Sequence, residues 1–436
     1  MSVIAPKFRL GYLVKGITDN IFWIIVLLTL IGIPVVQIVL IYIDFPVIDG
    51  EIWNPFRVFD AMTHPERALP LVKNFMQTDL FKVVAFPGFG FAALIAAAVI
   101  FVERKMLAKL QLRVGPFYCG KVEGILQLMG DGLKLISKEI IIPAKADKPL
   151  FWAVPVLFAA TAGAFVALIP VAPGWVVADI DLGLLAVFAV IGFFPIITIL
   201  AGWSSNSKFP FIGGIRALFQ MVSFEIPLIL SLLGIVMLTG TLSLVEIVES
   251  QVNFPWIIFM PIGAIVFFIC ILAELERIPF DLPEAESEIV AGWLTEFSGM
   301  MYGLVQLGSY LKLYAFAALF VVLFLGGWNG PWFFPIEPMA EIITDGIVLM
   351  PDALVIKDIP GLPLFSQEMI NGTIWFVLKT VGVIFFILLP RGVFPRVRID
   401  LLLKIGWYKL IVLAFVNIFI ALALVYGGII GPGGIL

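Results

Sequence analysis

Cysteine and histidine are almost absent from this chain of 436 residues. Cys119 and Cys270 are the two cysteines, and His64 is the single histidine. The chain alone therefore cannot ligate a four-cysteine iron–sulfur cluster or a haem held by two histidines. Any redox centre must belong to a partner, and we predict neither a metal site nor a catalytic residue within this chain.

Charged residues are also scarce, at 13% of the chain, whereas soluble domains contain about a quarter. Hydrophobic residues make up 61%. The sequence has no glycine-rich dinucleotide motif after a strand and no phosphate-binding P-loop. These absences exclude a soluble nucleotide-binding enzyme, and no nucleic-acid partner is expected. The composition indicates an all-α, polytopic membrane protein.

Apolar runs long enough to cross a bilayer, at least about 18 residues, predict about nine transmembrane helices. They cover residues 20–43, 83–102, 150–171, 182–203, 218–240, 254–275, 310–328, 373–390 and 405–430.

Lysine and arginine gather in alternate connecting segments, and such segments stay on the cytoplasmic side. Apart from the bases before the first span, they concentrate in residues 103–149 and 391–404, with Lys208 and Arg216 in residues 204–217 and with Arg277 and Lys312 flanking residues 276–309. The opposite loops 172–181 and 241–253 contain no base. We therefore expect a multi-pass protein of the cell's inner (plasma) membrane with a cytoplasmic N-terminus.

Residues 122–139 are too polar to span the membrane but have helical periodicity. The apolar positions are Ile125, Met129, Leu133 and Ile136, and the polar face carries Gln127, Asp131, Lys134 and Lys138. An amphipathic helix lying along the interface is predicted. It either anchors the loop or forms the wall of a cavity. The basic stretch that precedes it, with Arg104 and Arg113, suits an acidic partner or anionic lipid.

The segment at the end of the sixth predicted span, residues 274–296, carries the densest group of candidate functional residues, and we call it the acidic segment. Its seven acids, set against the single base Arg277, are Glu274, Glu276, Asp281, Glu284, Glu286, Glu288 and Glu296. Like charges held close in apolar surroundings cannot all ionise, so some of these carboxyls should exchange protons near neutral pH. A proton relay is predicted. If a helix resumes after Pro283, Glu284 and Glu288 share a face.

Glu225 lies inside the predicted span 218–240. An ionised carboxylate there costs about 2.5–3.5 kcal/mol on insertion scales. We expect it to be neutral, paired or facing a polar cavity. Arg216 is too far along the same helix to pair with it, so the partners of both residues must come from other segments, such as the acidic one.

Eight sequence strings carry a resemblance to a known family. In chain order they are ERKMLAKLQLRVGP, DGLKLISKE, PGWVVAD, GWSSNSK, GGIRALFQMVSFE, ERIPFDLPEAESEIVAGWLTEFSG, LFLGGW and RGVFPRVRIDLLLKIGW. From about residue 83 to 430 the chain resembles the H-type subunit of NADH-quinone oxidoreductase, which is subunit 1 of respiratory complex I. Residues 1–82 would then add an N-terminal transmembrane helix and an outer loop, and residues 431–436 a short tail.

The resemblance implies a subunit of a proton-translocating quinone oxidoreductase. Quinone would be the substrate, and iron–sulfur clusters would lie in hydrophilic partner subunits. Small membrane subunits, antiporter-like subunits and lipids would be further partners. The residues implied to border the quinone chamber are Arg104, Arg113, Asp131, Lys134, Arg216 and Arg277. Those implied to form the proton relay are Glu225, Glu274, Asp281, Glu284, Glu286 and Glu288.

Two departures from the family keep alternatives open: Ser309 precedes Tyr310 where the family commonly has a glutamate, and residues 1–82 precede the span with which the family core usually begins. The second reading is an ion-pumping subunit of a quinone-independent, membrane-bound hydrogenase or ferredoxin-driven complex. The third is a secondary transporter, which the position of the acids outside the membrane midplane disfavours. The sequence does not choose between NADH, ferredoxin and a deazaflavin as electron donor.

Overall fold

The computed structural model describes residues 79–119, 124, 126–252, 254–331 and 367–427. Within these ranges the chain is helical, and the only β-pairing is an isolated bridge between Ala172 and Trp175. The α-helices are α5 (Asp79–Val84), α6 (Phe89–Leu110), α7 (Gln127–Ser137), α8 (Lys148–Ala167), α9 (Gly183–Ile191), α10 (Phe193–Ser204), α11 (Lys208–Thr239), α12 (Leu244–Glu249), α13 (Pro261–Glu274), α14 (Glu286–Ile289), α15 (Gly299–Phe324), α17 (Gln367–Leu388), α18 (Pro390–Val393), α19 (Ile399–Lys404) and α20 (Ile411–Tyr426). A 3₁₀ turn, η1 (Gly292–Leu294), precedes α15, and a π-helical stretch, η5 (Ile405–Leu410), joins α19 to α20.

Seven helical segments among the described residues are long and apolar enough to cross a membrane. They are Phe81–Leu110, Lys148–Ala167, Gly183–Ser204, Lys208–Thr239, Gly299–Phe324, Met369–Val393 and Ile399–Tyr426. Helices are expected, because the bilayer interior offers no water to bond backbone groups. The predicted all-α membrane fold is confirmed, but the count of nine is not. The predicted span 20–43 lies outside the described residues, and α13 has only 14 residues where a span needs about 20.

Two helices begin earlier than the apolar runs indicated. Helix α11 begins at Lys208 and not at 218, and α15 begins at Gly299 and not at 310. An apolar run marks only the part of a helix that is surrounded by lipid or apolar side chains, whereas the backbone hydrogen bonds continue into the polar part. The expectation that Glu284 and Glu288 share a helical face is wrong, because α14 begins only at Glu286.

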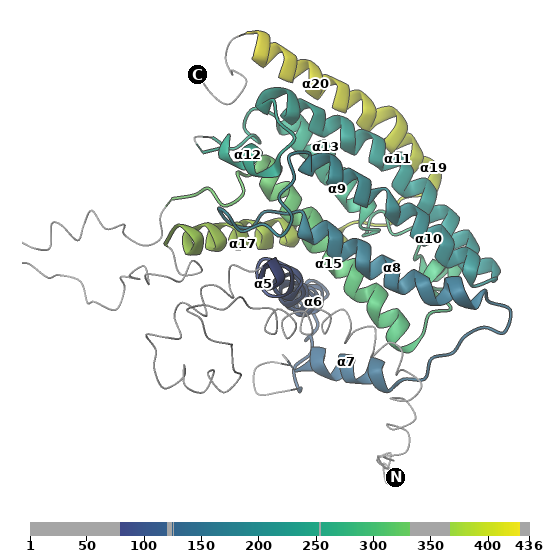
Figure 1. The fold of residues 1–436 in the computed structure, drawn as a ribbon. Coiled ribbons are helices and arrows are strands. Elements are labelled where there is room, and N and C mark those ends of the chain that lie inside the picture. Colours follow the sequence, from purple (N-terminus) through teal and green to yellow (C-terminus); the bar gives the residue numbers. More distant parts are fainter. Residues whose placement is uncertain (1–78, 120–123, 125, 253, 332–366, 428–436) are drawn as a thin grey trace, which may run out of the picture.

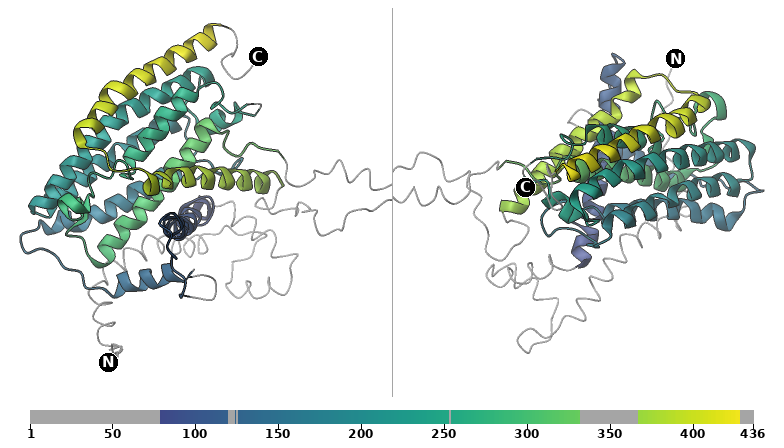
Figure 2. Two further views of the ribbon diagram at one scale, coloured as in Figure 1. Left: turned by 180° about the vertical axis from the view of Figure 1, so that it is seen from behind. Right: turned by 90° about the horizontal axis from the view of Figure 1, so that it is seen from above.

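Helix α15 forms the centre of the bundle, where it packs against α6, α8 and α17. In its most apolar stretch 83% of the residues are buried, against 22% in the segment Ile399–Tyr426, whose last helix, α20, lies at the outer edge beyond α11 (Figure 1). Helix α7 lies at the opposite edge, beside α6 and α15, in both Figure 1 and the reverse view of Figure 2. The predicted amphipathic helix therefore exists, and its apolar Met129 and Leu133 are exposed.

Gly213 of α11 supplies a test of the packing between α11 and η1. A Cβ atom at Gly213 would lie 2.6 Å from the backbone nitrogen of Trp293, and this contact cannot be relieved by a side-chain rotation. Gly213→Ala should displace η1 and destabilise the protein by about 1–3 kcal/mol, seen as a lower thermal midpoint in detergent. Gly130→Ala in α7 is the matched control, because its Cβ would meet nothing within 4 Å. Equal midpoints for the two variants would contradict this packing.

Candidate functional site

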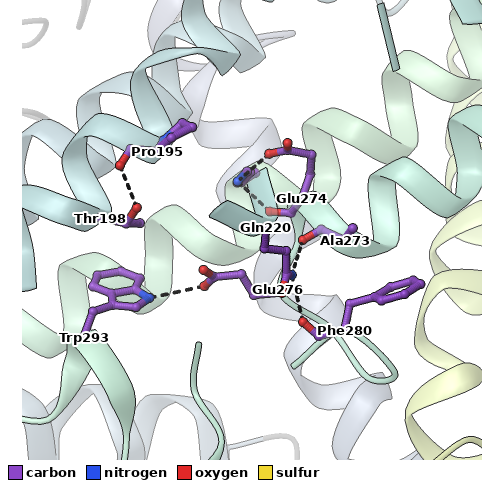
Figure 3. A network of polar contacts seen from close by, with 9 residues as sticks. Pro195, Thr198, Gln220, Ala273, Glu274, Glu276, Phe280 and Trp293 are labelled. Atoms are coloured by element: carbon purple, nitrogen blue, oxygen red, sulfur yellow. Dashed lines mark hydrogen bonds and ion pairs between the residues drawn. The ribbon is translucent and has the colours of Figure 1, made fainter. Parts of the chain in front are cut away.

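Helix α13 ends inside the bundle, so its last carbonyl groups need partners from other helices. Gln220 of α11 donates from Nε2 to the carbonyl oxygens of Ala273 at 2.7 Å and Phe280 at 2.8 Å (Figure 3). Lys312 of α15 donates from Nζ to the carbonyl oxygen of Glu274 at 2.6 Å. A cation at a helix C-terminus is also favoured by the helix dipole. These two buried side chains fix the end of α13.

The side chains of Glu274 and Lys312 form a loose, almost completely buried pair. Their relative exposures are 1% and 3%, and Oε2 of Glu274 lies 3.5 Å from Nζ of Lys312. Neither carboxyl oxygen of Glu274 has a hydrogen-bond partner among the described residues. Breaking a buried pair by removing one partner is costly, because a charge is left uncompensated.

Glu276 lies two residues beyond the last residue of α13 and carries a second buried carboxyl. Trp293 donates from Nε1 to its Oε2 at 3.3 Å, and its Oε1 is buried without a hydrogen-bond partner in the described part of the chain (Figure 3). Burial and the nearby charge of Glu284 raise the pKa of Glu276 to about 8, although the charge of Lys312 opposes the shift. The backbone of Glu276 is left-handed, with φ of 51°, which costs a residue with a side chain about 1–2 kcal/mol.

Glu225 of α11 is the third carboxyl of this group. A Cβ atom built on Gly192, at the junction of α9 and α10, would lie 3.2 Å from Oε1 of Glu225, so the carboxyl rests against that glycine. The charge of Lys312 acts on Glu225 as well as on Glu274 and Glu276.

Lys312 lies far from either end of α15. Because a helix rises about 1.5 Å per residue, Lys312 lies roughly 20 Å from the start of α15. We call Glu225, Glu274, Glu276 and Lys312 the Lys312 cluster.

Glu103, near the end of α6, is a buried carboxylate that binds two arginines. It is 2% exposed, and its Oε1 accepts from Nη1 of Arg277 at 2.7 Å and also pairs with Arg391. Its Oε2 accepts from the hydroxyl of Tyr310 at 2.9 Å, and the guanidinium of Arg277 lies over the Tyr310 ring. Glu103 therefore joins α6, the acidic segment, α15 and α18.

Three more ion pairs join the acidic segment and α7 to their neighbours. Arg396 pairs with Asp281 at 2.9 Å, Arg216 pairs with Glu288 at 2.6 Å, and Arg104 pairs with Asp131. Burial raises the pKa of Asp281 even though Arg396 opposes the shift. At Asp131 burial acts in the same upward direction, but hydrogen bonds from Arg104 and Gln127 outweigh it and lower the pKa.

The residues predicted to border a quinone chamber lie in two groups. Arg104 and Asp131 meet where α6 faces α7, and the charge of Lys134 also acts on Asp131. Arg216 and Arg277 each bind a carboxylate from another segment, as expected for Arg216. Arg113 and Lys134 are exposed.

The predicted relay acids are similarly divided. Glu225 and Glu274 belong to the Lys312 cluster, Asp281 and Glu288 pair with arginines, and the charge of Glu284 acts on Glu276. The side chain of Glu286 lies outside the described part of the structure. No group of three or more histidine, cysteine, aspartate or glutamate side chains suited to a metal occurs among the described residues.

Sequence reasoning missed Glu103, Tyr310 and Lys312 as members of these networks. For Lys312 a signal was present, because a lone lysine within an apolar helix is as unusual as the acid Glu225. Glu103 gave no such signal, since it precedes Arg104 and Lys105 and looks like part of a charged loop.

Comparison with known proteins accounts for most of the chain. A family model described as NADH dehydrogenase matches residues 83–422. The chain is 42% identical over 339 residues to the H-type subunit of NADH-quinone oxidoreductase from Bacillus cytotoxicus, which covers 76% of this chain and 92% of that protein. It is 40% identical over 357 residues to the same subunit from Bacillus thuringiensis, covering 80% of this chain and 97% of the relative. This chain belongs to the family of H-type subunits of NADH-quinone oxidoreductase, which are membrane subunits of an oxidoreductase complex.

Proposed function

We propose that this chain forms much of a quinone-binding chamber and couples quinone reduction to proton translocation through its acidic segment. The relatives are named as quinone oxidoreductase subunits, which supports quinone as the substrate. The observation that carries the proposal is that one continuous stretch of chain holds two kinds of carboxyl. Asp281 and Glu288 are bound to arginines, whereas the carboxyls of Glu274 and Glu276 are buried.

The arginines supply the polar contacts that a quinone headgroup needs. A quinone offers two carbonyl oxygens, and guanidinium groups donate hydrogen bonds to them in a fixed geometry. Arg104, Arg113, Asp131 and Lys134 would border the chamber along α6 and α7. Arg216 and Arg277 would border it along the acidic segment, where their present carboxylate partners hold them in place.

Reduction of a quinone to a quinol takes up two electrons and two protons, so the chamber must be linked to groups that carry protons. The acids proposed for this path are Glu225, Glu274, Asp281, Glu284, Glu286 and Glu288. Glu276, a further acid of the same segment, joins them because its pKa of about 8 lets it exchange protons near neutral pH. Glu276 would supply a buried carboxyl to a path that lacks one at position 309, where this chain has serine and the family commonly has glutamate.

The electrons come from partners in this proposal. With two cysteines and one histidine, the chain needs iron–sulfur clusters held by hydrophilic subunits. Small membrane subunits, antiporter-like subunits and lipids would surround it in the plasma membrane. The excess of bases in residues 103–149 and 391–404 supports a cytoplasmic position for the chamber and the N-terminus.

Photo-crosslinking of a quinone analogue to the purified intact complex tests the chamber. Labelled peptides are expected from residues 104–138 and 274–296, and an excess of unlabelled quinone should abolish the labelling. A peptide from residues 411–426 of the peripheral α20 is the internal control, because lipid-like partitioning would label it without competition. Absence of competable labelling in an active complex would refute the chamber and favour the quinone-independent, hydrogenase-like reading.

A further inference from the structure

Lys312 is a buried cation in the middle of the protein's central helix. It is 3% exposed, and its Nζ lies 4.3 Å from the ring centre of Phe194 and 5.8 Å from that of Phe316. An ammonium group within a membrane bundle is expensive unless charges and hydrogen bonds compensate it. The compensation comes from Glu274, through its carbonyl oxygen at 2.6 Å and its carboxyl at 3.5 Å.

The charges of the Lys312 cluster do not balance if every group is ionised. Three carboxyls, from Glu225, Glu274 and Glu276, come from α11, α13 and the segment after α13, whereas Lys312 is the cation that acts on all three. The carboxyls of Glu274 and Glu276 are buried and Glu225 is half-buried, so two uncompensated negative charges are disfavoured and the three acids must share protons. The ammonium therefore decides how many protons the acids bind.

We propose that Lys312 is a positioning residue of the proton path, whose ammonium is an internal counter-charge shared by Glu225, Glu274 and Glu276. This inference rests on the proposed function, because it assigns Lys312 a part in the same path. Ionisation of one acid is stabilised by the ammonium, and ionisation of a second is opposed until the first binds a proton again. The cluster then passes one proton at a time.

The side chain of Lys312 suits this part. Its flexible four-carbon stem lets the ammonium turn toward different carboxyls. In the structure the ammonium donates to the carbonyl oxygen of Glu274 at 2.6 Å. No proton needs to leave the lysine, since only the three carboxyls gain and lose protons. The competing explanation is structural: Lys312 would only bond the end of α13, in which case its charge would not affect proton exchange.

Lys312→Met, compared with Lys312→Arg, separates these explanations in the intact complex reconstituted into liposomes. Methionine keeps much of the volume and removes the charge that opposes the upward pKa shift of Glu276. In the pH profile of the rate of proton translocation coupled to quinone reduction, the alkaline limb should shift to a pH about one unit higher. The carboxyl bands of infrared difference spectra should show an additional protonated acid. The arginine variant should keep the wild-type limb and bands.

Lys379→Met is the matched control, since Lys379 of α17 is another partly buried lysine bound to backbone carbonyl oxygens, those of Leu325, Gly327 and Asn329. It lies outside the Lys312 cluster and should leave the limb unchanged. An unchanged limb and unchanged bands in an assembled Lys312→Met complex would overturn the inference. So would an equal shift in Lys379→Met.

Two further variants keep the outcome decisive. If Lys312→Met does not assemble, Glu274→Gln tests the pair from the other side. It frees the ammonium for Glu276, so the limb should move down, and an upward or absent shift would contradict the inference. Glu276→Gln tests the proposed function itself. If it leaves translocation and the limb normal, the acid path fails, whereas a change in Glu276→Gln without one in Lys312→Met removes only the role of Lys312.

Discussion

Replacing Glu103 by glutamine is expected to prevent stable assembly of the protein into its complex. The carboxylate is 2% exposed and is the shared partner of Arg277 and Arg391. Glutamine keeps the size but removes the carboxylate charge that the two guanidinium groups share. Removing one partner from a buried ion pair costs about 3–5 kcal/mol, which is a large part of the stability of a typical domain. The amount of assembled complex on native gels and its thermal midpoint in detergent measure the effect.

Glu249→Gln is the control for this experiment, because Glu249 is an exposed carboxylate on α12. Exposed substitutions of this kind usually change stability by no more than about 0.5 kcal/mol. Wild-type amounts of assembled Glu103→Gln complex, with an unchanged thermal midpoint, would show that Arg277 and Arg391 do not depend on their shared carboxylate. The two variants should therefore differ clearly.

The helices could be predicted from the sequence because hydropathy acts locally along the chain. A run such as residues 182–203 must be helical in a bilayer, and the structure has α9 and α10 there. The true starts of α11 and α15 could not be predicted, since glycines and polar residues in Lys208–Ala217 and Gly299–Ser309 weaken the hydropathy signal although both segments are helical. Local pattern therefore located the helices but not their polar ends.

The polar network was predictable only in part, and for a physical reason. The concentration of acids between Glu274 and Glu296 is visible in the sequence, and so is the misplaced charge of Glu225. The partners of these acids are not visible, because an ion pair such as Glu103 with Arg277 joins residues 174 positions apart. Lys312 could have been found by applying to bases the rule that singled out Glu225.

Glu276→Gln should reduce coupled turnover by roughly tenfold or more, since a positioned proton-transfer group commonly contributes at least about a hundredfold. Burial and the charge of Glu284 raise the pKa of Glu276 to about 8, so the carboxyl is neutral below that pH and ionised above it. Glutamine resembles the neutral form and should not disturb the contact with Trp293, but it cannot release a proton. Rates of quinone reduction and proton translocation on either side of pH 8 measure the loss. Glu276→Asp, which keeps an ionisable group, should retain more of the coupled rate.

Stability supplies an independent test of the same carboxyl. Because the folded-state pKa of Glu276 is raised from an ordinary 4.5 to about 8, the folded protein binds more protons than the unfolded chain between these values. The contribution of the group to stability is complete below the lower value and is lost as the pH rises through about 8. The thermal midpoint of the wild type should therefore fall over this interval more steeply than that of Glu276→Gln. Parallel midpoints would mean that Glu276 is ionised at neutral pH, and a loss of turnover in the variant would then have to come from a changed contact and not from a missing proton.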